Sequence, residues 1–532
     1  MTQRVQRAVN LANLLTKTAR RLPDEAAIIS GDVTVTWREL DNAVSTLAHA
    51  LRDRGVKTGD CVLIHGTNHI EYIQAMLATW RAGAVMAPTN VRLTPSDILV
   101  IAQTCRPTVI LCDRDFTEHA AAVTDELDVP GGILWLGGST EDPSSVAGLQ
   151  YQGEFKDAAV KVGDHAWYFF TSGTSGAPKC AVLTHDQMGF VVTNHLCDLM
   201  PGTTDRDRSL VVAPLSHGAG IHLLPQIAAG AATVLPQAGR LDGAEVWELV
   251  ERERVTNMFT VPTILKVIAE HPDAVTRDHS SLRFVIYAGA PMGAADQQHA
   301  REVLGEVLTQ YYGLGEVTGN ITVLPPALHD HPTPSSTDIR TCGFPRTGMQ
   351  VSIQDDDGNE VEAGHTGEIC VAGPAVFTGY LRNEAANDAA FRDGWFRTGD
   401  LGLLDEYGFL YVTGRASDMY ISGGSNIYPR DIEEKLLQHP SVSEVAVFGM
   451  PDAKWGEIGV AICVAAAGAE CDAEELKEWL EPKVARYKMP RHVLIWTELP
   501  KSGYGKVVKR TLREQLEASA WPPVPTPSAL QS

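Results

Sequence analysis

The sequence has few features of a disulfide-bonded, zinc-binding or membrane-spanning protein. Its nine cysteines are scattered and form no C-x-x-C pair, so we expect reduced, packed thiols in a cytoplasmic protein. No apolar run approaches the roughly 20 residues that cross a bilayer, so no transmembrane segment is expected. No convincing internal repeat is present.

Basic charge is also scarce. The 44 Lys and Arg residues face 66 Asp and Glu residues, which gives a net charge of −22. A nucleic-acid-binding protein would present a basic face, so no nucleic-acid partner is expected. An anionic nucleotide would have to be held by local cations and a metal ion.

The first 21 residues are basic and no acid precedes Asp24, which is a composition that organelle transit peptides share. However, Leu11, Leu14 and Leu15 recur at helical spacing. We therefore expect a structural first helix here.

The 532 residues exceed one hydrophobic core, so at least two domains are expected. Strand-like runs at 210–213, 232–235 and 284–287 alternate with helical patterns such as 244–254. This alternation predicts an α/β fold for a large N-terminal domain, residues 1–414, with several parallel strands and helices on their faces.

A smaller α+β domain is expected after Gly414. Asp472 and Glu475 are placed to begin its second helix as N-cap and N3 residues. The expected elements are a helix at 431–438, strands at 444–448 and 460–465, a helix at 472–483 and a strand at 492–496. The proline-rich tail, 521–532, is expected to be disordered.

The segment from Thr171 to Lys179 is the most informative in the chain. It follows the strand-like run Trp167–Phe170 and contains two glycines, several hydroxyls and a lysine. Backbone amides turned inward beside hydroxyls match phosphate oxygens. The spacing is not that of a Walker A loop, and by itself an ordinary connection fits almost as well.

Further segments complete an ordered set. They are Ala288–Pro291, Tyr311–Glu316, Trp395–Asp400, Gly414–Asp418 and Leu499–Lys506. Together with the Thr171–Lys179 segment, they resemble the adenylate-forming superfamily of acyl-CoA synthetases, non-ribosomal peptide adenylation domains and firefly luciferase. The resemblance runs from about residue 10 to about residue 513, and the chain looks most like an AMP-forming fatty-acid or aryl-acid CoA ligase.

The resemblance implies that the enzyme uses ATP and Mg²⁺ to convert a carboxylic acid into an acyl adenylate, then forms a thioester with CoA and releases AMP and pyrophosphate. Adenine would meet Tyr312 and the backbone of Gly289, Ala290 and Pro291. Asp400 and Arg415 would bind the ribose, and Glu316 and Thr174 would ligate Mg²⁺. The residues expected to hold the phosphates are Thr171, Ser172, Gly173, Thr174, Ser175, Gly176 and Lys179.

The resemblance also implies a moving lid, residues 418–520, attached through a hinge at 415–417. Lys506 of the lid would contact the reacting carboxylate and α-phosphate. After rotation of the lid, Gly423 and Gly424 would let the pantetheine arm pass close to the backbone. Trp455 would stack on the CoA adenine, although a core tryptophan is an equally good interpretation.

This sequence departs from the family pattern at several positions. Gly315 replaces the usual threonine, and its lost contact would have to be supplied by Thr318, by water or by the backbone. Cys180, Ser417 and Tyr504 are also unusual. These departures bear on rate and substrate more than on reaction class.

The substrate follows from what the acyl-pocket segment lacks. Residues 213–222 contain no acid to pair with a substrate ammonium, and an unpaired buried charge is costly. We therefore expect an acid without an α-amino group, either a medium-chain fatty acid or an aromatic acid, with His217 at the acyl pocket or the thiol channel.

Three other functions remain open. They are loading of a separate carrier protein, a luciferase-like oxygenase and an inactive nucleotide-binding homologue. A homodimer is possible.

Overall fold

The computed structural model describes residues 6–151, 153–171, 178–333, 339–452, 454–501 and 507–519. Several expected features lie outside these residues: Ser172, Gly173, Thr174, Ser175 and Gly176 of the phosphate loop, Tyr504, Lys506 and the tail 521–532. Across the described ranges, no helix has the length and apolar character needed to cross a membrane.

The first sheet has six strands in the order β10-β9-β5-β4-β6-β7. Only β9 and β10 pair antiparallel. Helices α4 (Pro95–Cys105) and α5 (Thr117–Thr124) cover one face, and α2 (Trp37–Asp53) and α3 (Ile70–Arg81) cover the other. The strands are β4 (Cys61–His65), β5 (Val85–Thr89), β6 (Val109–Asp113), β7 (Ile133–Leu136), β9 (His165–Thr171) and β10 (Lys179–Thr184).

The second sheet has seven strands in the order β15-β14-β13-β11-β12-β2-β3. Its pairs are parallel except β2 with β3. Its strands are β2 (Ala26–Ser30), β3 (Val33–Thr36), β11 (Arg208–Val211), β12 (Ala232–Leu235), β13 (Asn257–Thr260), β14 (Phe284–Tyr287) and β15 (Leu308–Gln310). The expected strands are confirmed, although β11 begins and ends two residues earlier than expected.

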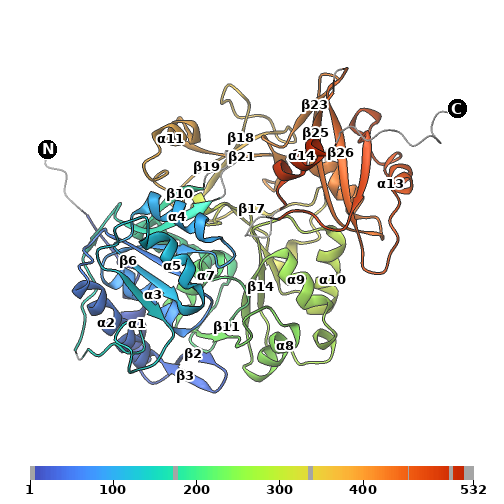
Figure 1. Ribbon diagram of the computed structural model, residues 1–532. Coiled ribbons are helices and arrows are strands. Elements are labelled where there is room, and N and C mark those ends of the chain that lie inside the picture. Colours follow the sequence, from blue (N-terminus) through green and yellow to red (C-terminus); the bar gives the residue numbers. More distant parts are fainter. Residues whose placement is uncertain are drawn as a thin grey trace.

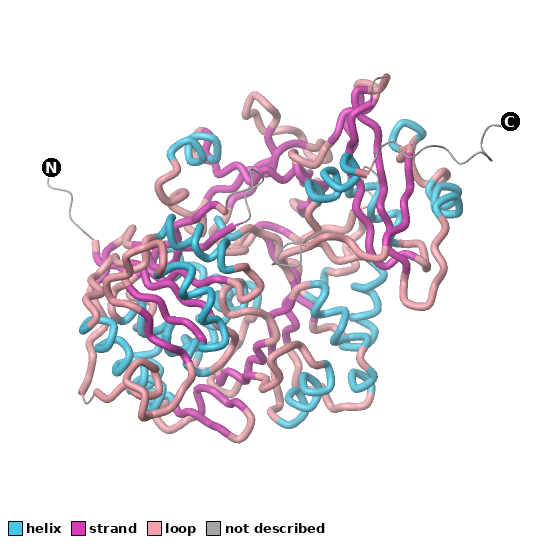
Figure 2. The backbone as a smooth tube through the Cα atoms, viewed as in Figure 1, coloured by secondary structure: helices cyan, strands magenta, loops and turns pink. Residues whose placement is uncertain are grey.

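One core is shared by the two large sheets. It contains α1 (Asn13–Arg21), α6 (His185–Asn194) and α7 (Gly218–Ala229) together with α2 and α3. The outer face of the second sheet packs on α8 (Gly243–Arg252), α9 (Pro262–Glu270) and α10 (Ala294–Leu304). Helices therefore lie on both sides of the strands (Figure 2). The expected first helix is confirmed, because α1 buries Leu15 in this core.

A third, antiparallel sheet follows the parallel ones. It consists of β18 (Gln350–Gln354), β19 (Gly367–Ala372), β20 (Phe391–Arg392), β21 (Trp395–Leu404) and β22 (Leu410–Arg415), with α11 (Glu384–Ala390) beside it. Two short pairs join β1 (Arg7–Ala8) to β8 (Val160–Lys161) and β16 (Thr322–Val323) to β17 (Phe344–Pro345). Short 3₁₀ segments are Arg114–Phe116, Pro272–Val275, Gly315–Val317, Pro326–Leu328 and Arg486–Lys488, and His195–Leu199 is a π-helical turn.

The C-terminal part forms a separate lobe, orange to red at the upper right of Figure 1. Its sheet contains β23 (Tyr420–Ser422), β24 (Ser425–Ile427), β25 (Val442–Asp452), β26 (Gly456–Ala465) and β27 (His492–Trp496). One face packs on α12 (Pro429–Leu437) and α13 (Ala473–Leu480), and the other on α14 (Lys509–Ala518). As expected, Asp472 caps α13 by accepting from the amides of Glu474 and Glu475. The expected fold, a large multi-sheet α/β domain with a smaller α+β domain, is confirmed.

The carboxyl ends of β11, β13, β14 and β15 meet at one edge of the second sheet, because these neighbours are parallel. In open α/β sheets, ligands bind beyond this edge. The cysteines contribute no covalent link near it: all nine are free, and most are buried.

Candidate active site

Two of the expected segments leave neighbouring strands at this edge. Ala288–Pro291 follows β14, and Tyr311 and Tyr312 follow β15. Gly289 has φ +84°, a backbone conformation that favours glycine. Gly289, Ala290 and Pro291 are exposed, so their backbone is accessible to a flat ligand.

Two hydroxyl groups from other parts of the chain hold the Glu316 carboxylate in place. Glu316 is 6 % exposed and lies in the short 3₁₀ helix after Tyr312. Its Oε1 accepts hydrogen bonds from the hydroxyls of Thr171 at 3.2 Å and Tyr380 at 3.0 Å. Thr171 ends β9, so one side of the expected phosphate loop lies directly against Glu316.

Lys179, on the other side of that loop, approaches the same place. Its Nζ lies 5.0 Å from the ring centroid of Tyr380. Burial, reinforced by the charge of Glu316, raises the pKa of Tyr380 far above its usual range, which keeps its hydroxyl protonated as a donor. Both flanks of the expected phosphate loop therefore lie near Glu316. Thr171 contacts Glu316 directly, whereas Lys179 lies against Tyr380, which binds Glu316.

Tyr380 is a site residue that the sequence analysis missed. It follows Gly379, which has φ +134°, and its own amide donates to Asn387 Oδ1 at 2.6 Å. The adjacent glycine and tyrosine, between two predicted motifs, were the available signal.

The structure also explains Gly315. A Cβ at this position would lie 2.6 Å from the Phe169 ring, which is too close for a real side chain, and a tight 3.0 Å from Thr171 Cγ2. Phe169 therefore occupies the space that a threonine would need. Thr318 does not replace the missing donor, because it is buried and its hydroxyl donates to the Val317 carbonyl at 2.6 Å.

Asp400 links two of the expected nucleotide residues. Its Oδ2 accepts the Tyr312 hydroxyl at 2.6 Å, and its Oδ1 lies 2.8 Å from Arg415 Nε. The β21–β22 register places Asp400 directly opposite Arg415. Antiparallel pairing thus fixes both groups.

The pKa of Arg415 is affected by both carboxylates, Asp400 and Glu316. Burial lowers the pKa of its guanidinium, but Asp400, Tyr312 and Glu316 outweigh that effect and raise it. Asp400, Arg415 and Glu316 therefore share one electrostatic environment.

His217 lies at the N-terminus of α7, at the same edge. Its Nδ1 is 3.0 Å from the Ser216 hydroxyl, and its ring packs edge-on against Phe169 at a centroid distance of 5.2 Å. His217 thus borders the ring that fills the space beside Gly315.

The glycines after His217 leave no open space for a substrate. A Cβ on Gly218 would lie 2.5 Å from the Phe259 ring, and one on Gly220 would lie 2.0 Å from the Leu215 carbonyl oxygen. Both glycines are needed for close packing. A cavity of about 10 Å³ beside Ala219, His222 and Phe259 has room for about one water.

The expected CoA residues lie together in the C-terminal lobe. Gly423 donates its amide to the Trp455 carbonyl at 2.9 Å, and its added Cβ would lie 2.9 Å from the Trp455 ring. Gly424 has φ +83° and an open side. Trp455 is 39 % exposed, which excludes a core position, and Lys454 and Arg491 lie 5.3 and 5.7 Å from its ring.

The residues present fit Mg²⁺ held through the nucleotide. Among the described residues, no group of three or more His, Cys, Asp or Glu side chains could hold a metal ion. Mg²⁺ is usually bound by one or two carboxylates plus substrate phosphates, and Glu316 is such a carboxylate.

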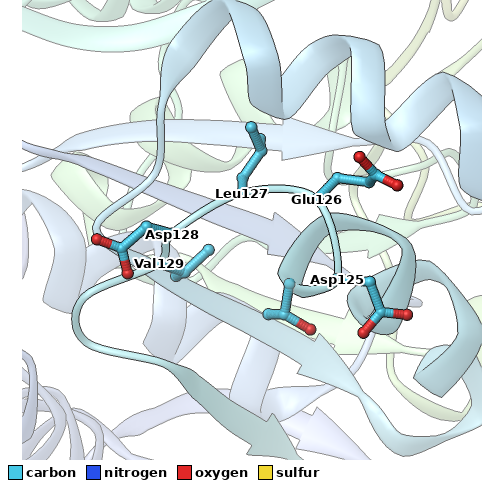
Figure 3. Close-up of a pocket in the computed structure, with 6 residues that line it drawn as sticks. Asp125, Glu126, Leu127, Asp128 and Val129 are labelled. Atoms are coloured by element: carbon cyan, nitrogen blue, oxygen red, sulfur yellow. The ribbon is translucent and has the colours of Figure 1, made fainter.

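A hollow of about 430 Å³ lies elsewhere, in the turn after α5 (Figure 3). It is lined by Thr124–Val129, which includes Asp125, Glu126 and Asp128. Three carboxylates would repel a nucleotide, and no site residue lines it.

Comparison with known proteins agrees with this geometry. The AMP-binding enzyme family matches residues 15–381, and the AMP-binding enzyme C-terminal domain matches residues 431–506. Feruloyl-CoA synthase from an Amycolatopsis species is 35% identical over 93% of this chain and 97% of its own length. Indoleacetate–CoA ligase from Aromatoleum aromaticum is 33% identical over 92% and 95%.

A solved structure shows the same fold. The amide bond synthetase McbA from Marinactinospora thermotolerans superposes with a TM-score of 0.85 at 29% identity, over 95% of this chain and 99% of that chain. The expected enzyme class, an AMP-forming acyl-CoA synthetase, is confirmed by the curated relatives. The expected use of ATP, Mg²⁺ and CoA is confirmed at the level of the family. The chain belongs to the AMP-binding enzyme family, the adenylate-forming superfamily that its motifs resemble.

Proposed function

We propose that this protein activates an aromatic carboxylic acid with ATP and transfers the acyl group to CoA. The observation that carries the proposal is the double anchoring of Glu316 by Thr171 and Tyr380, beside the Tyr312–Asp400–Arg415 set. Glu316 would hold Mg²⁺ against the phosphates. Bound Mg²⁺ would neutralise phosphate charge that builds up during transfer to the acid.

The remaining residues have positioning roles in this reaction. Asp400 would accept hydrogen bonds from the ribose, and Tyr312, held by its hydroxyl, would offer its ring to adenine. Lys179 would contribute positive charge to the phosphates. Lys506, outside the described residues, would donate to the carboxylate and α-phosphate during the first step.

An aromatic acid is favoured over a long aliphatic chain by the walls of the expected acyl pocket. Phe169, His217, Phe259 and Tyr311 present rings there, and Phe259 and Tyr311 stack at 6.0 Å. Flat rings pack well on one another. Aromatic acids are also named for two relatives, feruloyl-CoA synthase and indoleacetate–CoA ligase.

The C-terminal lobe would act as a lid that turns about residues 415–417. Gly423, Gly424 and Trp455 would then line the path of CoA, with Lys454 and Arg491 near its phosphates. We also propose a cytoplasmic homodimer, which light scattering of the purified protein would test.

The test is a panel of aryl, medium-chain fatty and amino acids, assayed with ATP and Mg²⁺ for pyrophosphate, and after addition of CoA for AMP and thioester mass. We expect all of these products with aryl acids. Glu316→Gln should lower kcat by at least about tenfold, whereas Glu362→Gln, at an exposed position, should not. The absence of AMP with every acid would contradict the proposal.

The same panel tests the acceptor. An amine should be included because McbA is an amide bond synthetase, and a phosphopantetheinylated carrier protein should be included as well. Preference for either over CoA would replace the second half of the proposal.

A further inference from the structure

Within the described residues, one buried charged side chain near the expected acyl pocket forms no ion pair. Arg346 follows β17 and is 1 % exposed. Its Nη2 lies 3.2 Å from His195 Nδ1. Its Nε and Nη1 have no hydrogen-bond partner among the residues that the structure describes.

Nearby groups do not neutralise this charge. Asp198 is the nearby carboxylate, but its oxygens accept from the amide and hydroxyl of Thr347 at 2.8 and 2.9 Å, and within the described ranges no ion pair joins it to Arg346. Burial lowers the pKa of Arg346 to about 9, although Asp198 and Tyr311 oppose the shift. The guanidinium therefore stays charged at neutral pH.

Apart from Asp198, the polar residues named near Arg346 are neutral. His195 is fully buried, and burial, together with the charge of Arg346, lowers its pKa well below the usual value. Asn320 is also fully buried, and in the described part of the chain neither atom of its amide has a partner. The Arg346 amide donates to the carbonyl of Ile321, the next residue.

A series of ring contacts connects this polar cluster to the expected acyl pocket. His195 lies 6.3 Å from the Tyr311 ring, and Tyr311 stacks on Phe259. Phe259 covers Gly218, next to His217. Tyr311 is also the residue before Tyr312, whose hydroxyl is bound by Asp400. Ring contacts thus run from His195 through Tyr311 and Phe259 to the position next to His217.

A buried guanidinium is normally paired, because an unpaired buried charge is costly. Its best complement is a carboxylate, which accepts several N–H donors at once. Among the described residues no carboxylate pairs with Arg346, so its Nε and Nη1 donors are left for a partner from outside the chain. A water molecule would satisfy some donors but leave the charge unbalanced.

We propose that Arg346 determines specificity by binding a second carboxylate at the far end of the acid, so that the substrate is a dicarboxylic aromatic acid. This inference rests on the proposed function, since it assigns the distal end of that same pocket. Entry of the substrate would require Tyr311 or Phe259 to turn aside, because the cavity beside Phe259 has a volume of only about 10 Å³.

The test compares matched pairs of aryl acids that differ only in a second carboxylate, at several ring-to-carboxylate lengths. The wild-type protein should show a kcat/KM at least about tenfold higher for one diacid than for its monoacid partner. Arg346→Met keeps the approximate volume and removes the charge. It should abolish this ratio, mainly by raising KM for the diacid.

Two controls separate recognition from folding. Arg206→Met, at an exposed position, should leave the diacid-to-monoacid ratio unchanged. If Arg346→Met does not fold, Arg346→Lys keeps a charge but loses the planar fork, and it should lower kcat/KM for the diacid more than for the monoacid. An unchanged ratio in a folded variant would overturn the proposal.

The outcomes also separate this inference from the proposed function. AMP formation with monoacids and no preference for any diacid would overturn the role of Arg346 alone. No AMP with either kind of acid would overturn the proposed function itself.

Discussion

At the scale of single residues, Gly315 shows how one site residue depends on the side chain that faces it. The position lacks a threonine because the Phe169 ring occupies its space. The remaining hydroxyl donors, Thr171 and Tyr380, hold the Glu316 carboxylate. These two donors hold the carboxylate without a side chain at position 315.

Gly315→Thr should therefore destabilise the protein by about 1–3 kcal/mol through overpacking. The double variant with Phe169→Ala should recover part of that loss, because it vacates the space. Urea unfolding of the single and double variants measures the coupling. Strict additivity of the two free-energy changes would contradict the proposed clash.

Tyr380→Phe removes a donor to Glu316 and leaves the ring in place. The loss of a hydrogen bond to a charged group, about 1.5–3 kcal/mol, should lower kcat/KM for ATP by roughly 10- to 100-fold. Tyr407→Phe, at a residue that is 73 % exposed, is the matched control. Equal rates for the two variants would show that Tyr380 does not position Glu316.

From the sequence, site residues within motifs could be predicted, whereas those outside motifs could not. Tyr312, Asp400 and Arg415 were found because they belong to ordered motifs, and the structure brings all three together. Phe169 and Tyr380 were missed because their importance comes from contacts with Gly315 and Glu316, which lie far away in the sequence. Such pairing has no local pattern in a single sequence.

At the scale of elements, the antiparallel pair β21–β22 positions two residues of the proposed nucleotide site. Its register sets Asp400 opposite Arg415, and the β21 strand also carries Thr398, which accepts from the Asp400 amide at 3.1 Å. Loss of the carboxylate charge should therefore affect nucleotide binding more than folding.

Asp400→Asn should raise KM for ATP by about tenfold or more, since hydrogen bonds to charged groups contribute roughly 1.5–3 kcal/mol. The change keeps the shape of the side chain, so thermal unfolding should shift little. Steady-state kinetics with varied ATP measures this effect. A normal KM with a reduced kcat would place Asp400 in the chemical step instead.

Prediction was best for parallel strands that carry continuous apolar runs. β12, β14 and β27 were expected with the bounds that they have, because continuous apolar runs mark them. The third sheet was not predicted, because β21 mixes glycine and charged residues with apolar ones. The close packing that requires glycine at positions 218 and 220 was also not predicted, because it depends on the facing Phe259 and Leu215.

At the scale of the whole molecule, several buried histidines make stability depend on pH. Burial lowers the pKa values of His65, His185 and His222 to about 4. The unfolded chain therefore binds more protons than the folded one between about pH 4 and 6.5. Stability should be complete above pH 6.5 and should fall as the pH drops through this window.

The loss should be on the order of 1–3 kcal/mol per histidine. Urea unfolding at pH 7.5 and pH 5 measures it. His185→Gln should show a shallower decline than the wild type, although it also loses the bond from the Leu11 amide. A pH-independent free energy of unfolding across this range would contradict the assignment of these histidines as neutral.

The proposed lid contacts the large domain where α12 packs against β22. Within the lid, Lys509 of α14 lies 2.8 Å from Glu433 of α12 and ties these two helices together. If the lid supplies Lys506 only for the first step, the two half-reactions should separate. Lys506→Ala should lose acyl-adenylate formation yet still transfer the acyl group from a supplied adenylate to CoA. Equal loss of both steps would point to misfolding of the lid.

The most direct measurement of the central claim is a quenched single turnover with the preferred aryl acid, ATP and Mg²⁺, first without CoA and then after its addition. The account predicts about one equivalent of enzyme-bound acyl adenylate together with pyrophosphate, followed by conversion to thioester and AMP. Release of ADP and phosphate, or thioester formation with no adenylate at any time, would contradict it.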